Sequence, residues 1–197
     1  ELKKSLGIPL DKMVIAVLPG SRKSEILHHS KPLADFINIY KKQNADVEIV
    51  LALNKESDLL GELKQLSKKI SVIYDSTQKV LASCDMAIVA SGTATLEAAI
   101  LAKPMVVIYK SNKLSNFILS NFFLKTKFIS LPNILSQEKI VFELRQNQVS
   151  GKEISEKVEL TFKNQEVIVK KLSLIRDSLL VKDSNKFSIA LREILAK

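Results

Sequence analysis

The sequence predicts an α/β fold, a Rossmann-like parallel sheet with helices on both faces and a helical C-terminal tail. Short runs rich in valine and isoleucine alternate with segments whose apolar residues recur at helical spacing. The runs are apolar at almost every position, as expected for parallel strands that are buried on both faces. With 46% hydrophobic residues among 197, the chain can also bury a sizeable core.

The first two-thirds of the chain is expected to form repeated strand–helix units. Each unit needs a right-handed crossover, which produces a doubly wound sheet with ligands at the carboxyl ends of its strands. The first helix is marked by Ile26, Leu33, Phe36, Ile37 and Tyr40, and the second by Leu59, Leu60, Leu63 and Leu66. The strands are expected at Met13–Leu18, Val47–Leu53, Ser71–Tyr74, Met86–Val89, Met105–Tyr109 and Phe128–Leu131.

The C-terminal part is expected to be helical from Gln137 onward, beginning with the apolar residues Ile140, Val141 and Leu144. We therefore assign residues 1–146 to a Rossmann-like domain and residues 147–197 to a helical tail that packs and carries no chemistry. The opening segment, ELKKSLGIPLDK, is typical of a helix and turn that connect to a preceding domain.

The net charge of +9 favours partners that carry phosphate, such as nucleotides, nucleic acid or an anionic lipid surface. Lysine supplies nearly all of this charge, whereas proteins that read base sequence rely on clustered arginine. Most of these lysines are expected simply to be solvated, and nucleic acid is not the expected partner.

The metal-ligating residues are few. Cys84 is the single cysteine, and the two histidines, His28 and His29, are adjacent in a predicted helix. No zinc-like spacing results, so we expect no metal site, no cofactor, a reducing compartment and a buried Cys84. No window reaches the roughly 18 apolar residues that a membrane span needs.

The loop after the first strand reads LPGSRKSE and leads directly into a helix. Gly20 allows close approach of the backbone to a ligand, the amides near Ser21 face it, and Arg22 can pair with a phosphate oxygen. The alternative is a tight turn with a helix cap at Ser21 or Ser24. The loop matches neither of the common phosphate-loop patterns.

The loop after the fourth strand, ASGTATLEAA, is more informative. Its hydroxyl groups and glycine, Ser91, Gly92, Thr93 and Thr95, stand where a helix begins and can hold a diphosphate. Glu97 lies one turn further on, where a carboxylate can accept hydrogen bonds from both hydroxyls of a ribose. The alternative is that Thr93 only caps the helix and Glu97 only complements its dipole.

Two further segments are ambiguous. Asn133 in SLPN can donate and accept hydrogen bonds at once, but Pro-Asn is also a common turn or helix entry. The aromatic and lysine-containing segment from Leu114 to Phe128 fits either an interfacial helix on an acidic bilayer or a buried helix over a sheet.

Three motifs in this order, LPGSRKSEI, ASGTATLEAAILAKPMVVIYK and FISLPNIL, resemble lipid-A-disaccharide synthase. The resemblance runs from about Val14 to about Glu143. It implies the C-terminal, nucleotide-sugar-binding half of a two-domain GT-B glycosyltransferase, with the N-terminal acceptor domain absent from this chain. The pattern of strand, loop and helix is shared with other nucleotide-sugar glycosyltransferases.

The resemblance implies an inverting, metal-independent transferase. Its donor is UDP-2,3-diacylglucosamine and its acceptor is 2,3-diacylglucosamine 1-phosphate, from which it forms the β-1,6-linked lipid A disaccharide and releases UDP. The implied place is the cytoplasmic face of the inner membrane of a Gram-negative bacterium, as a peripheral protein. A homodimer through the C-terminal tail is also implied.

Residue by residue, the resemblance makes Arg22 and Asn133 catalytic positions. It assigns UDP binding to Gly20, Ser21, Arg22, Ser91, Gly92, Thr93, Thr95 and Glu97. The general base is expected in the absent half, so the isolated chain is expected to be inactive. Alternatives are another UDP-sugar glycosyltransferase or epimerase, or a noncatalytic module that binds nucleotide or an anionic membrane.

Overall fold

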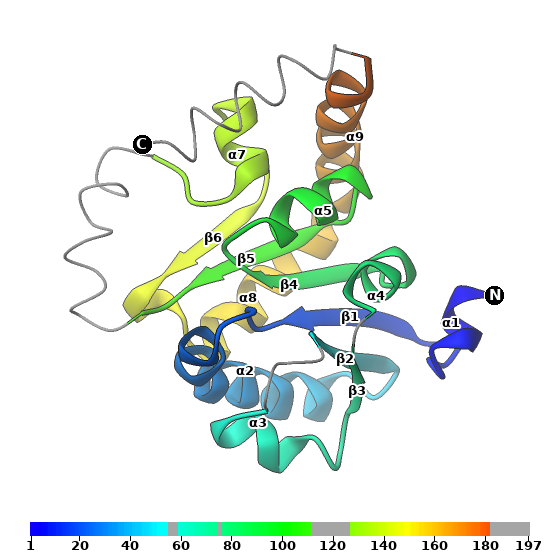
Figure 1. Cartoon of the computed structure of the whole chain (residues 1–197), viewed down its shortest axis with the longest axis vertical. Coiled ribbons are helices and arrows are strands. Elements are labelled where there is room, and N and C mark those ends of the chain that lie inside the picture. Colours follow the sequence, from blue (N-terminus) through cyan, green and yellow to red (C-terminus); the bar gives the residue numbers. More distant parts are fainter. Residues whose placement is uncertain (55–58, 75, 112–126, 182–197) are drawn as a thin grey trace.

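A six-stranded, fully parallel sheet in the order β3-β2-β1-β4-β5-β6 forms the centre of the computed structural model (Figure 1). The structure describes residues 1–54, 59–74, 76–111 and 127–181. The order reverses direction between β1 and β4, which creates a crevice at the carboxyl ends of the strands. The strands are β1 (Met13–Leu18), β2 (Val47–Leu53), β3 (Ser71–Tyr74), β4 (Met86–Ala90), β5 (Met105–Tyr109) and β6 (Phe142–Arg145).

Helices cover both faces of this sheet (Figure 1). Alternate residues of β1 show why both faces need cover, because Ile15 packs into one buried cluster and Ala16 into the other. One face carries α2 (Lys23–Gln43), α3 (Gly61–Leu66) and α8 (Gly151–Lys163). The other carries α4 (Thr77–Ser83), α5 (Ala94–Ile100), α7 (Leu131–Ser136) and α9 (Gln165–Val181), with the short α1 (Leu2–Ser5) beside α4.

The predicted fold class is confirmed, and the first five strands lie where the sequence predicted them. Four of them have the predicted bounds, and β4 extends one residue further, to Ala90. The first predicted helix is α2, whose five marker residues are all buried. Runs of valine and isoleucine that are buried on both faces therefore identified the strands of this sheet.

The prediction for the sixth strand was wrong. Residues 128–130 form no strand, because the N–H groups of Ile129 and Ser130 donate to the carboxylate of Glu143 and α7 begins at Leu131. The sixth strand is instead Phe142–Arg145, within the segment predicted as helical, and it pairs with β5. Apolar residues at 140, 141 and 144 fit either structure, and a strand this short cannot be told from a helix by periodicity.

The tail is helical where the structure describes it, and its two helices take opposite faces. The α8 helix packs against α2, and α9 packs against α5. The part of the predicted helical tail beyond residue 181 lies outside the described residues, as does most of the aromatic segment from Leu114 to Phe128. Within the described ranges, no helix has the length and apolar character needed to cross a membrane.

Candidate functional site

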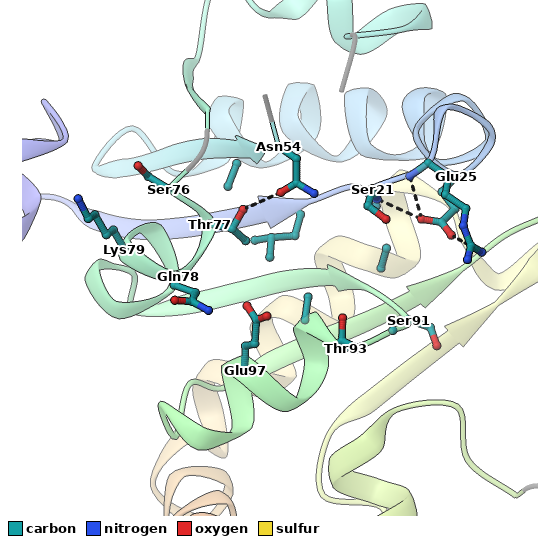
Figure 2. A pocket seen from close by; sticks show the side chains of 17 residues that line it. Ser21, Glu25, Asn54, Ser76, Thr77, Gln78, Lys79, Ser91, Thr93 and Glu97 are labelled. Atoms are coloured by element: carbon teal, nitrogen blue, oxygen red, sulfur yellow. Dashed lines mark hydrogen bonds and ion pairs between the residues drawn. The ribbon is translucent and has the colours of Figure 1, made fainter. Parts of the chain in front are cut away.

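A cleft of about 730 Å³ opens at the carboxyl ends of β1, β2 and β4, at the crevice that the strand order predicts (Figure 2). Four chain segments supply its polar lining. They contribute Gly20, Ser21, Arg22 and Glu25 after β1, Asn54 after β2, Ser76, Thr77, Gln78 and Lys79 after β3, and Ser91, Gly92, Thr93 and Glu97 after β4.

The Gly20 loop (residues 19–25) connects β1 to α2, and its backbone N–H groups bind the carboxylate of Glu25, a residue of the same loop. Glu25 Oε2 accepts hydrogen bonds from the N–H groups of Ser21 at 3.1 Å and Arg22 at 3.4 Å (Figure 2). Arg22 is the N-cap residue of α2, in place of the serines that the sequence analysis considered. The Arg22 side chain lines the cleft, is 80% exposed and forms an ion pair with Glu25 Oε1 at 3.6 Å.

Gly20 is required by this arrangement. Its φ of +119° lies in a region that L side chains rarely adopt, and a Cβ there would lie 2.6 Å from Glu25 Oε2. The glycine thus lets the Glu25 carboxylate fold back over the loop.

The Gly92 loop (residues 91–97) connects β4 to α5 and presents two polar side chains to the cleft. Thr93 is the N-cap residue of α5, but its side chain makes no cap hydrogen bond within the described part of the chain. Figure 2 shows Thr93 and Glu97 pointing from α5 into the cleft. Among described residues, no hydrogen bond or ion pair engages the Glu97 carboxylate, so both side chains can bind a ligand.

Two other predicted ligand groups in this loop face its supporting structure. Thr95 is fully buried, donates from Oγ1 to the carbonyl of Gly92 at 2.7 Å, and accepts from the N–H of Leu131 at 3.2 Å. Ser91 lines the cleft, but its hydroxyl donates to the carbonyl of Ile129 at 2.8 Å. The spacing of hydroxyl residues could not separate these supports from Thr93.

Asn133 does not line the cleft. Its side chain is fully buried, and its amide nitrogen donates to the carbonyl of Val141 and to Glu143 Oε1. Its amide oxygen accepts from the N–H groups of Ile140 and Val141 at 2.8 and 2.9 Å. These four bonds use the whole hydrogen-bonding capacity of the amide.

His29 is a buried residue whose contacts the sequence did not reveal. Its Nδ1 lies 2.7 Å from the carbonyl of Pro19, and its Nε2 accepts from the N–H of Lys110 at 3.0 Å. This pair of contacts requires a neutral ring with its proton on Nδ1. Burial lowers the pKa of His29 below its ordinary value, while the bond to Pro19 and the charge of Glu25 act in the opposite direction. The ring therefore ties the Gly20 loop to the end of β5.

The lining also includes residues that the sequence analysis did not select. Asn54 directly follows β2, and Thr77 Oγ1 donates to its side-chain oxygen at 3.4 Å. Ser76, Gln78 and Lys79 follow β3 and line the same cleft. The position after a buried strand, which identified the other two loops, was available as a signal here too. Cys84 is buried as predicted, and burial raises the pKa of its thiol to about 11.

The fold and the cleft define a Rossmann-like domain of the class that glycosyltransferases and sugar-nucleotide epimerases contain. UDP-N-acetylglucosamine 2-epimerase from Neisseria meningitidis, solved with UDP-N-acetylglucosamine, matches with a TM-score of 0.61 at 14% identity, over 92% of this chain and 48% of that one. The ADP-heptose heptosyltransferase II of E. coli matches with a TM-score of 0.58 at 10% identity, over 84% of this chain and 51% of that one. At these identities the likeness concerns the fold alone.

The chain belongs to the lipid-A-disaccharide synthase family. The family model described as lipid-A-disaccharide synthetase matches residues 1–196. The synthase of Colwellia psychrerythraea is 36% identical over 161 residues, which are 77% of this chain and 40% of that protein. Synthase 1 of Legionella pneumophila strain Philadelphia 1 is 33% identical over 156 residues, 78% of this chain and 40% of that protein. The chain thus spans about 40% of the length of these relatives.

Proposed function

We propose that this chain is the donor-binding half of a lipid-A-disaccharide synthase and holds UDP-2,3-diacylglucosamine in the cleft. One observation carries the proposal. The exposed guanidinium of Arg22 stands on one wall of the cleft, and Thr93 and Glu97 point into it from the other. A cation, a hydroxyl donor and a carboxylate are the groups that a nucleoside diphosphate needs.

The diphosphate is assigned to the space between the two loops. Arg22 supplies charge-assisted hydrogen bonds from the Gly20 loop, and Thr93 supplies its hydroxyl from the Gly92 loop. Gly20, Ser21, Ser91 and Gly92 shape the walls, while Thr95 acts from behind as a support. The N–H groups of Ser21 and Arg22 already bond to Glu25, so the contribution of the Gly20 loop is chiefly its arginine side chain.

Glu97 is assigned to the ribose. Its carboxylate can accept from both hydroxyls, and it lies one turn of α5 beyond Thr93. The same lining continues to Ser76, Thr77 and Gln78, which leaves the β3–α4 side of the cleft for the base.

The reaction we propose is inverting transfer of the 2,3-diacylglucosaminyl group. The 6-hydroxyl oxygen of 2,3-diacylglucosamine 1-phosphate forms a bond to C1 of the donor sugar, and the bond from C1 to the UDP oxygen breaks. Arg22 offsets the negative charge that develops on the departing UDP, so no metal ion is invoked. The hydroxyl proton passes to a base assigned to the N-terminal half of the enzyme, and the isolated chain is inactive.

The lipid substrates place the reaction at the cytoplasmic face of the inner membrane, and the protein is proposed to bind there peripherally. A homodimer through the tail stays a prediction, since part of that tail lies outside the described residues.

Calorimetric titration with UDP, with ADP as control and at two salt concentrations, tests this proposal. We expect saturable binding that prefers UDP and survives the higher salt. Binding that follows charge alone, with a steep loss in salt, would instead support a noncatalytic anion-binding module. Equal binding of donors with and without acyl chains would favour another UDP-sugar enzyme.

A second titration tests the ribose contact. Glu97→Ala should weaken UDP about tenfold, because a hydrogen bond to a charged group contributes about 1.5 kcal/mol or more. Pyrophosphate, which has no ribose, should bind the variant and the parent chain equally. Equal losses for both ligands would remove Glu97 from the ribose role.

A further inference from the structure

The Gly92 loop is held from behind by the segment that precedes α7. Ser91 Oγ donates to the carbonyl of Ile129 at 2.8 Å, and the N–H of Leu131 donates to Thr95 Oγ1 at 3.2 Å. These hydrogen bonds connect the loop to residues that lie 36 to 38 positions later in the chain. The Gly92 loop thus faces the cleft on one side and is held on its other side by the segment before α7.

This supporting segment is itself organised around one carboxylate. Glu143 on β6 accepts from the N–H of Ile129 at 3.1 Å and from the N–H and Oγ of Ser130 at 2.9 and 2.7 Å. It also accepts from Asn133 Nδ2 at 2.9 Å and from the guanidinium of Arg145 at 3.1 Å. Its side chain is only 6% exposed.

The burial of these groups explains why the carboxylate is needed. Ile129 and Ser130 are buried but belong to no helix or strand, so their N–H groups have no regular backbone partner. A buried N–H without an acceptor is costly, and a buried carboxylate is tolerated only when several donors surround it. The Glu143 carboxylate therefore supplies the acceptor that the buried donors of residues 129–133 need, and these donors in turn stabilise the buried carboxylate. The geometry of the segment thus depends on Glu143.

We propose that Glu143 is a positioning residue for the nucleotide cleft: it fixes residues 129–133, which in turn fix Ser91 and Thr95 of the Gly92 loop. This inference rests on the proposed function, because it assigns the Gly92 loop to the donor. Asn133 belongs to the same unit and acts through Glu143 and the β6 backbone, since all four of its hydrogen-bonding positions are used there.

Amide hydrogen exchange of the ligand-free chain tests the positioning role directly. Glu143→Gln replaces one acceptor oxygen with a donor that faces other donors. We expect exchange at residues 95–97 and 131 to become at least tenfold faster, while amides of β1 and β2 change much less. Thr161→Val is the matched control, because it removes a buried hydroxyl bond within α8, to the carbonyl of Lys157. Uniform acceleration across the chain in Glu143→Gln would overturn the proposal.

UDP affinity tests the consequence for the cleft. Glu143→Gln and Thr95→Val are each expected to weaken UDP about tenfold, and Thr95→Ser, which keeps the hydroxyl, should restore most of the binding. Thr161→Val should bind as the parent chain does.

The double variant Glu143→Gln/Thr95→Val should lose much less than the hundredfold product, because both changes interrupt one connection. The proposal would be overturned if the double variant lost about a hundredfold in UDP affinity, or if Glu143→Gln bound UDP as tightly as the parent chain does. If the parent chain binds no UDP, the proposed function fails, and hydrogen exchange still decides whether Glu143 positions the loop.

Discussion

The two loops that face each other across the cleft are built differently. The Gly20 loop bonds to its own residue, Glu25, and leaves a long exposed cation, Arg22, at its tip. The Gly92 loop leaves Thr93 and Glu97 directed into the cleft and is held by residues distant in the chain. One wall of the cleft therefore offers a positive charge on a long side chain, whereas the other offers hydrogen-bonding groups on a loop that is held in place from behind.

Alanine substitution of the two loop glycines is expected to give the largest difference in stability between the two loops. Gly20→Ala combines a φ of +119° with a contact of 2.6 Å to Glu25 Oε2, so we expect a loss of about 3 kcal/mol in unfolding free energy. Gly92→Ala has a φ of +153° but open space around the new Cβ, and should lose only about 1 kcal/mol. Urea denaturation of both variants measures the difference, and equal losses would contradict the described packing of Glu25.

Arg22 tests whether the Gly20 wall acts on the reaction itself. In a full-length synthase that contains this domain, Arg22→Ala should lower kcat about 100-fold, with a smaller effect on KM, because it removes charge stabilisation of the leaving UDP. Lys42→Ala removes one charge from an exposed position at the end of α2 and is the control. An unchanged kcat would remove Arg22 from the transition state.

His29 makes the Gly20 loop sensitive to acid. Burial lowers the pKa of His29 in the folded chain, so below about pH 6.5 the unfolded chain takes up a proton that the folded chain does not. Stability should therefore be unaffected above that pH and fall below it, with a slope approaching about 1.4 kcal/mol per pH unit.

Thermal unfolding between pH 7.5 and 5 measures this dependence. His29→Gln should flatten the acid part of the curve, whereas His28→Gln should leave it in place. Glu25, His28 and Lys110 are the charged or titratable groups around the ring, and they do not change the sign. An identical slope in parent and His29→Gln would show that another group titrates.

Substitution of Thr93, on the Gly92 loop, is expected to have the smallest effect on UDP binding. Thr93→Val keeps the volume and removes the hydroxyl, which should weaken UDP about fivefold, or about 1 kcal/mol. The melting temperature should not change, because the Thr93 side chain makes no cap bond among the described residues. Thr93→Ser should bind as the parent does. A lower melting temperature with normal UDP binding would make Thr93 a cap.

The sequence predicted most of the fold because its strands carry a strong local signal. Val47–Leu53 is apolar at almost every position and is buried on both faces, and such a continuous apolar run is typical of a central strand in a parallel sheet. β6 was missed because Phe142–Arg145 is short and its apolar spacing also fits a helix. Phe142–Arg145 is a strand because it pairs with β5, and its own residues do not show this pairing.

The candidate site was predictable to the level of loops but not of individual side chains. The rule that ligands bind after parallel strands found the loops at Gly20 and Gly92. It could not show that Thr93 faces the cleft while Thr95 is buried, because both are threonines at a helix start. Glu143 gave no local signal either, since its partners Ile129, Ser130 and Asn133 lie 10 to 14 positions earlier in the chain and meet it only when that segment folds back beside β6.

The last two described helices affect the order in which the chain can fold during synthesis. The α8 helix completes one face of the sheet and α9 the other, and Tyr40 on α2 donates to Glu159 on α8 across 119 positions of sequence. One face is therefore completed only when α8 has been synthesised, and the other only when α9 has been synthesised. All six strands are made before these two helices, so we expect the growing chain to expose apolar surface that is prone to aggregation until both helices have packed.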